Sequence, residues 1–187
     1  MLMSELALLI DAVERARVQY LEAVAGLNHH QSVFKKELAQ WSILQVTEHL
    51  VHAEDAGVNG IWRALDGYRR GEPIWQGELV HGGKSIEEVV EQTWQTKEKA
   101  PEVAEPRWGG VIGYWAASLK SRRVVLEDLS AALDGVSLEA VVYPHPISGP
   151  LDARQRLEFL RFHLDRHRGQ VERLKNKNGA PESAGAP

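Results

Sequence analysis

The sequence contains no cysteine at any of its 187 positions. A disulfide framework, a thiolate metal site and a cysteine nucleophile are therefore excluded. Any thiol that takes part in a reaction would have to be a small molecule, and histidine and carboxylate side chains remain as metal ligands. The lack of cysteine also agrees with a reducing compartment, so we expect a cytoplasmic protein.

Clustered positive charge and long apolar runs are also missing. The formal net charge is −4, with 22 Lys and Arg residues scattered among 26 Asp and Glu residues, unlike the basic stripe of a nucleic-acid-binding protein. Residues 2–10 are apolar, but charged residues follow at once and no basic segment precedes them, which argues against a signal peptide. No stretch approaches the roughly 18 apolar residues of a membrane span. We expect a soluble protein that acts on a small molecule and binds neither nucleic acid nor membrane.

What the sequence does contain is helical periodicity. Apolar residues recur at spacings of three and four in segments near residues 3–26, 42–65, 114–133 and 152–175. Ser42, Ser85 and Asp152 are each followed three positions later by Gln or Glu, which is typical of a helix start. We predict one all-α domain over residues 1–175, including a short extra helix after Ser85, and a disordered tail over residues 176–187.

The segments between these helices carry helix-breaking residues. Gly67 is expected to end the second helix, and residues 67–84 hold five glycines, which predicts a loop long enough to cover a site. Residues 141–143 are β-prone, and the three prolines within residues 143–150 exclude a helix interior there. These residues therefore predict a turn-rich connection before the last helix.

The last helix carries the chemistry that the sequence shows best, a His-x-x-x-His pair at His163 and His167. Residues four apart lie one turn apart on one helix face, so both imidazoles can point at a single ion. A projection at about 100° per residue places them on the same arc as the apolar residues Leu157, Leu160, Leu164, Val171 and Leu174. Buried imidazoles must be paired, and for an isolated pair hydrogen bonds to protein groups are the commoner solution.

A third histidine changes that balance in favour of a metal. His49 lies at the margin of the apolar face of the second helix, beside Ala53 and Ala56, which leave room for a ligand. Together with His163 and His167 it allows a three-imidazole cluster between two helices of a bundle. Three neutral imidazoles suit a divalent ion such as zinc or nickel and leave at least one coordination position open.

Other polar residues are weaker candidates. The adjacent His29 and His30 point in different directions, and His52 projects toward the polar face, so we expect none of them to bind the ion. Glu54 projects among apolar residues and either orients an imidazole or, as we favour, pairs with an arginine of a neighbouring helix. Glu48 should point away from His49, so the sequence identifies no general base.

The sequence resembles the DinB-like superfamily of four-helix bundles, which is also described as a damage-inducible or metal-dependent hydrolase family. The features that carry the resemblance are Trp41-Ser42 before the second helix, the triplet Glu48-His49-Leu50, the segment His145-Pro146-Ile147-Ser148-Gly149-Pro150-Leu151, and His163-x-x-x-His167-x-x-Gln170. Each feature is weak alone, but their order and spacing span most of the chain.

The resemblance implies an up-down-down-up bundle with one long crossover, often a homodimer, with a metal held by His49, His163 and His167. Family members with known activity include transferases and isomerases that depend on a small thiol, bacillithiol or mycothiol. Relatives often carry Glu directly after the first histidine of the final pair, whereas this chain has Leu164. The general base of a zincin-like peptidase is therefore absent.

Two functions remain open at this point. One is a metal-dependent enzyme of hydrolase or thiol S-transferase type, in which the ion activates water or a small-molecule thiol. The other is a helical bundle that binds a metal or small ligand without turnover. The sequence does not distinguish them.

Overall fold

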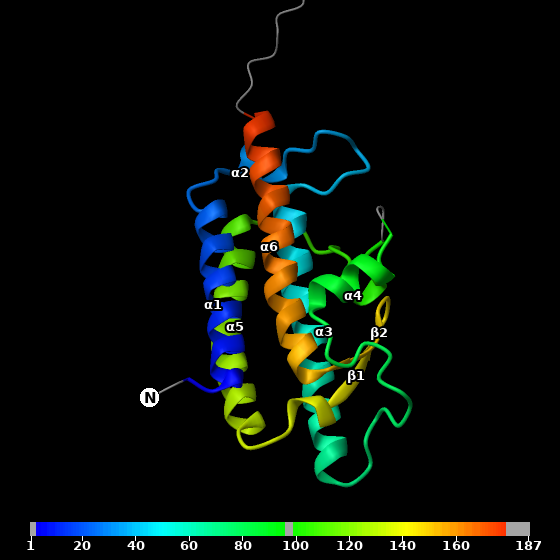
Figure 1. Cartoon of the computed structure of the whole chain (residues 1–187). Helices are drawn as coiled ribbons and strands as arrows, with labels where there is room; N and C mark the ends of the chain where they lie inside the picture. Colours follow the sequence, from blue (N-terminus) through cyan, green and yellow to red (C-terminus); the bar gives the residue numbers. More distant parts are fainter. Residues whose placement is uncertain (1–2, 96–98, 179–187) are drawn as a thin grey trace, which may run out of the picture.

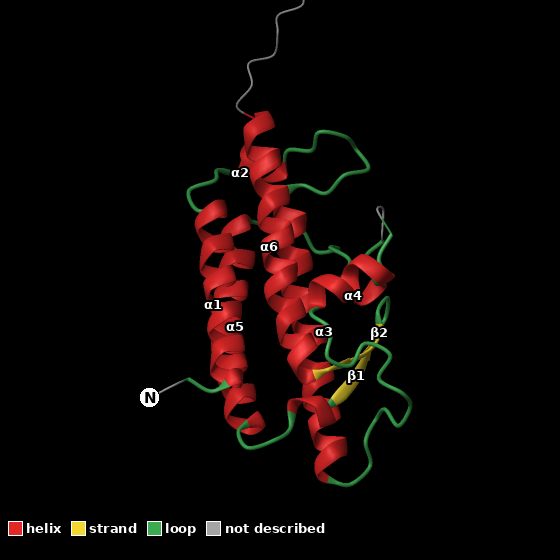
Figure 2. Ribbon diagram, viewed as in Figure 1, coloured by secondary structure: helices red, strands yellow, loops and turns green. Residues whose placement is uncertain are grey.

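The computed structural model of the chain describes residues 3–95 and 99–178. Four long helices form the body of the protein: α1 (Glu5–Val24), α3 (Ile43–Arg69), α5 (Ile112–Leu133) and α6 (Ala153–Asn178). The smaller elements are α2 (His29–Val33), α4 (Ile86–Thr93), the 3₁₀ turns η1 (Glu102–Ala104) and η2 (Leu138–Ala140), and the strands β1 (Val142–His145) and β2 (Gly149–Asp152). The predicted all-α fold with a short extra helix is confirmed, and one small hairpin is added to it (Figure 2).

The four long helices run up, down, down and up in chain order (Figure 1). Helix α1 packs against α5 and α6, and α3 packs against the same two helices. Because α3 and α5 are parallel, the chain must cross the length of the bundle between them, and it does so through residues 70–111, which contain α4 and η1. This arrangement has the long crossover that the resemblance implied.

The predicted helix starts are confirmed by side-chain hydrogen bonds. Ser42 accepts from the backbone N–H of Gln45, whose side chain accepts from the backbone N–H of Ser42. Ser85 makes the same reciprocal pair with Glu88. The backbone N–H of Gln155 donates to the Asp152 carboxylate, at 2.8 Å. These bonds satisfy backbone donors that the first turn of a helix leaves without partners.

Gly67 does not end α3, contrary to the prediction. The helix continues to Arg69, and the residue that ends it is Gly71, whose φ of 74° lies in the left-handed region. The N–H of Glu72 donates to the carbonyl of Gly67 at 2.8 Å, which is the terminal bond of a Schellman motif. A Cβ on Gly67 would lie 2.7 Å from the Glu72 carbonyl oxygen. Gly67 is thus needed for the close approach of the returning chain.

Two short elements were not predicted. The connection after α1 contains α2, because Asn28 starts a helix through a capping box with Gln31. The connection before α6 is a hairpin in which β1 pairs antiparallel with β2, and Gly149 has a φ of 75°. Its prolines, Pro144 and Pro150, lie opposite each other in the register, which a two-stranded ribbon tolerates because each strand has a free edge.

Helix α6 extends three residues beyond its expected end at Lys175. Between Lys175 and Gly179 the sequence contains no glycine or proline, and the Lys175 ammonium donates to the carbonyl of Ala23 near the end of α1, at 2.7 Å. Cations next to the last carbonyls of a helix are favourable. Residues 176–178 are therefore helical, and the remainder of the predicted tail, 179–187, lies outside the described residues.

The core occupies the space between the four long helices and is continuous from one end of the bundle to the other. Its fully buried members include Tyr20 of α1, Leu65 of α3, Leu126 of α5 and Leu157 of α6. A smaller hydrophobic cluster packs α4 against α6 and the hairpin. Among the described residues, no helix is both long and apolar enough to cross a membrane.

Candidate metal centre

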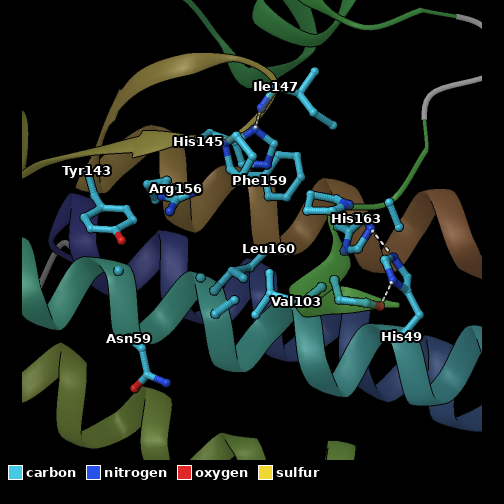
Figure 3. A pocket seen from close by; sticks show the side chains of 18 of the residues that line it. His49, Asn59, Val103, Tyr143, His145, Ile147, Arg156, Phe159, Leu160 and His163 are labelled. Atoms are coloured by element: carbon cyan, nitrogen blue, oxygen red, sulfur yellow. Dashed lines mark hydrogen bonds between the residues drawn. The ribbon is translucent and has the colours of Figure 1, made fainter. Parts of the chain in front are cut away.

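The three predicted histidines meet between α3 and α6 (Figure 3). His49 comes from α3, and His163 and His167 come from successive turns of α6. The Nε2 atom of His163 lies 3.0 Å from the Nε2 atoms of both other rings, and one ligand nitrogen from each ring lies within 4.8 Å of the others. All three side chains are buried. The structure thus brings together the three histidines that the helix projections turned inward.

Hydrogen bonds on the far side of two rings decide which nitrogens carry protons. The Nδ1 atom of His49 lies 2.7 Å from the Ala104 carbonyl oxygen, and that of His167 lies 2.8 Å from the side-chain oxygen of Gln170. Since these oxygens only accept, each Nδ1 carries the hydrogen of its neutral ring and each Nε2 presents a lone pair. A hydrogen on Nε2 of His163 can be donated either to Nε2 of His49 or to Nε2 of His167, but not to both at once. The cluster thus has more lone pairs than protons, which suits a cation.

Burial keeps the imidazoles in the neutral form that a metal needs. Desolvation lowers the pKa of His49 to about 4 and that of His167 to about 3. Burial, followed by the neighbouring rings, lowers the pKa of His163 well below its ordinary value. Protons therefore do not compete with a metal ion for these nitrogens near neutral pH.

The geometry is close to what an ion requires. Two imidazole nitrogens bound to a tetrahedral ion at about 2.0–2.1 Å lie about 3.3 Å apart, so the two 3.0 Å separations from His163 need to open by only a few tenths of an ångström. The nitrogens of His49 and His167 lie within 4.8 Å of each other and would adjust toward the same separation. The bonds from Nδ1 to Ala104 and Gln170 are the kind that orient metal-binding histidines. His49, His163 and His167 therefore fit a divalent ion with three protein ligands.

The crossover is fastened next to this cluster by Glu48, the neighbour of His49. Its fully buried carboxylate accepts backbone N–H groups from Arg107, Trp108 and Gly109, at 2.6, 2.5 and 3.0 Å. These bonds hold the segment that follows η1, and η1 supplies the carbonyl that contacts His49. The Glu48 carboxylate is directed to this segment and not to His49, in line with the prediction, and it positions the chain that orients His49.

The cluster opens into a cavity of about 600 Å³ between α3 and α6. All three histidines line it, and Ala53 and Ala56 leave the predicted room beside His49. Trp41 packs against the His49 ring, with 4.8 Å between the ring centroids. The hairpin, the end of α4 and residues 99–104 supply the remaining walls. A small molecule could reach the open side of a bound ion from this cavity.

Comparison with known proteins agrees with the fold. The sequence pattern of the DinB superfamily matches residues 12–171, which include all three histidines. The chain belongs to the DinB superfamily. It is also similar to the uncharacterized protein YuaE of Bacillus subtilis (strain 168), with 29% identity over 167 residues that cover 87% of this chain and 94% of the relative.

Within this DinB superfamily fold, the other predicted polar residues have separate roles. The Glu54 carboxylate pairs with Arg17 of α1 at 2.7 Å, and both side chains are buried, which confirms the favoured pairing. His52 lies edge-on to Trp115, with its Nε2 3.6 Å from Glu48, and does not join the cluster. His29 is exposed on α2, away from the cluster.

Two cavity residues had no assigned role in the sequence analysis. Arg156 is buried on α6, seven residues before His163, and lines the cavity. It lies on the same helix face as Leu160 and the histidines. A charged residue on this apolar face was the sequence feature that could have indicated a functional role for Arg156. His145 also lines the cavity, and its Nδ1 accepts the backbone N–H groups of Ile147 and Ser148, at 3.2 and 3.1 Å. Only the folded hairpin reveals these bonds.

Proposed function

We propose that this member of the DinB superfamily is a metal-dependent enzyme that transfers a small-molecule thiol to its substrate, or hydrolyses it, at a divalent ion bound by His49, His163 and His167. The observation that carries the proposal is the position of the three Nε2 atoms at the wall of a cavity of about 600 Å³. A closed structural ion would normally have a fourth protein ligand, whereas these three nitrogens leave a side open to a small molecule.

The protein's own part in such a reaction is to bind and to orient. Ala104 and Gln170 fix the tautomers of His49 and His167, so that their lone pairs point at one place. The apolar walls would exclude water from a bound substrate. A divalent ion held there lowers the pKa of a bound water or thiol and so supplies a nucleophile near neutral pH.

The surroundings favour a thiol over water as the nucleophile. No aspartate or glutamate is present among the described residues that line the cavity, and the nearby Glu48 and Glu54 are occupied by backbone N–H groups and by Arg17. A free thiol has a pKa of about 8.5 and water of about 15.7. A thiol therefore needs less help from a general base, and since the chain has no cysteine it would arrive as a cosubstrate.

Metal analysis of protein purified without a histidine tag tests the site. We expect about one equivalent of a divalent ion in the wild type and in His52→Ala, which removes a neighbouring histidine outside the cluster, and little in His163→Ala. Equal metal content in all three proteins would refute the three-histidine site. Thermal unfolding with and without a chelator then measures how strongly the ion stabilises the fold.

Turnover needs a separate assay. We expect metal-loaded wild type to consume electrophilic small molecules, such as activated halides or epoxides, only when a low-molecular-weight thiol is added. His163→Ala should be inactive under the same conditions. Activity without any thiol would instead support hydrolysis. A metal-loaded protein that is inactive across both screens would support the alternative of a bundle that binds a metal without turnover.

A further inference from the structure

The cavity beside the histidines is positively charged, although the protein as a whole carries a net charge of −4. Four of its described lining residues are cationic side chains, Arg63, Lys99, Arg156 and Arg166, and none is a carboxylate. Most of the rest are apolar or aromatic. Away from the histidines, such a composition attracts an organic anion and disfavours an organic cation.

Arg156 differs from the other three cations because it is buried, with 5% of its surface exposed. Within the described part of the chain no hydrogen bond or ion pair satisfies its guanidinium, and its Nε is buried without a partner. Its guanidinium makes a cation–π contact with the ring of Tyr143, with the guanidinium carbon 5.4 Å from the ring centroid. Buried arginines are normally paired with an acid, since an unpaired buried charge is strongly unfavourable.

The group remains a cation in this position. Burial lowers the pKa of Arg156 to about 10, and the nearby Tyr143 opposes the shift, so the guanidinium is protonated at neutral pH. Its forked N–H groups match the two oxygens of a carboxylate or a phosphate. An anion from outside the chain would supply the missing partner.

The backbone of α3 is shaped to admit Arg156 and Tyr143 at this point. A Cβ on Gly60 would lie 2.7 Å from the Tyr143 ring and 2.9 Å from a terminal nitrogen of Arg156. Tyr143 is also held from its hydroxyl, which accepts from Arg63 at 3.2 Å. The arginine is therefore confined between the helix and the hairpin.

We propose that Arg156 binds the anionic group of the substrate, a carboxylate or phosphate, and that an apolar body connects this group to the part that reacts at the histidines. Figure 3 shows Arg156 and Tyr143 at one end of the cavity and His49 and His163 at the other. Along α6 the seven-position step from Arg156 to His163 spans about 10 Å. Leu160, Phe159 and Val103 lie between the two ends and line the cavity.

This assignment of a substrate class rests on the proposed function, but the anion site can be tested without it. The probes are 2-naphthoate, 2-naphthyl phosphate and the uncharged 2-naphthylmethanol, titrated by calorimetry into full-length protein stripped of metal by a chelator. Without an ion at the histidines, any preference for an anion must come from the protein. The two anions distinguish carboxylate from phosphate as the better-matched group.

We expect at least one anion to bind the wild type tenfold or more tightly than the alcohol. Arg156→Met should reduce that preference at least tenfold and leave the affinity for the alcohol within about twofold. Arg156→Lys should restore part of it. The matched control is Arg161→Met, on the same helix but paired with Glu87 outside the cavity, and it should behave as the wild type.

An equal affinity of the wild type for the anions and the alcohol would overturn the proposal, as would an Arg156→Met variant that retains the preference. If Arg156→Met fails to fold, a wild type without anion preference still overturns the proposal, and Arg156→Lys then tests whether the preference depends on the guanidinium. Metal content separates this inference from the proposed function. If His163→Ala retains its metal while the anion preference persists, only the metal site is refuted. If metal binding depends on His163 but no anion preference is found, only the anion site is refuted.

Discussion

Replacing Glu48 with alanine should lower the free energy of unfolding by about 4 kcal/mol. The carboxylate is fully buried and accepts three backbone N–H groups, from Arg107, Trp108 and Gly109. Hydrogen bonds to a charged group contribute about 1.5–3 kcal/mol each, so three of them give about 4–5 kcal/mol even at the lower bound. A domain of this size has a total stability of about 5–15 kcal/mol, so the variant should fold but be much less stable.

Urea denaturation followed by circular dichroism measures this change, and Glu48→Gln is the matched control. Glutamine keeps one oxygen for Arg107 and Trp108, but its amide nitrogen would face the N–H of Gly109, so we expect about half of the loss. Hydrogen exchange should show the amides of Trp108 and Gly109 losing protection before the rest of the bundle. The reasoning is wrong if Glu48→Ala stays within about 1 kcal/mol of the wild type, because three hydrogen bonds to a buried carboxylate should not be lost at so small a cost.

Three further predictions follow from groups described above. Burial, opposed by Arg17, raises the pKa of Glu54 from 4.5 to about 7. Between these pH values the folded protein holds a proton on Glu54 that the unfolded chain releases, so the free energy of unfolding should fall by on the order of 3 kcal/mol as the pH rises from 4.5 to 7. Urea denaturation at pH 5 and pH 8 should show this dependence in the wild type and not in Glu54→Gln. Gly60→Ala should destabilise the fold by about 1–3 kcal/mol, because the added Cβ would overlap the Tyr143 ring. The control is Gly113→Ala, where the added Cβ meets open space. In the same series of thermal melts this control should be neutral or stabilising by up to about 1 kcal/mol. The pKa values of His49 and His167 are lowered to about 4 and 3, so protons should not displace a bound metal ion at mildly acidic pH. Metal content measured after dialysis at a series of pH values should therefore be unchanged down to pH 5.5. Release near pH 6.5 would contradict the claim that burial keeps these ligands neutral.

The sequence predicted the parts of the site that depend on helix periodicity. His163 and His167 share a face with Leu157 and Leu164, and that face packs into the core, so a projection of the helix was enough to turn both rings inward. The same reasoning placed His49 on the inner side of α3. The starts at Ser42 and Ser85 were equally accessible, because a capping box involves residues only three positions apart.

Contacts between distant parts of the chain could not be predicted in this way. The N–H groups that Glu48 accepts lie 59 to 61 residues away, and nothing in the local pattern around residues 107–109 indicates a buried carboxylate. The choice between Gly67 and Gly71 as the end of α3 depends on the path of the returning chain. The role of Arg156 becomes visible only when the hairpin places Tyr143 over it and leaves it without an acid.

The two halves of the histidine cluster lie 114 residues apart in the chain. During synthesis α3 emerges from the ribosome long before α6. His49 is therefore present without His163 and His167 while the crossover, α5 and the hairpin are being translated. No ion can be held by all three rings until α6 has been translated and has docked against α1 and α3. If the cluster holds the proposed ion, that ion should be acquired late in the biogenesis of this protein, and a nascent chain that ends before His163 should not bind it.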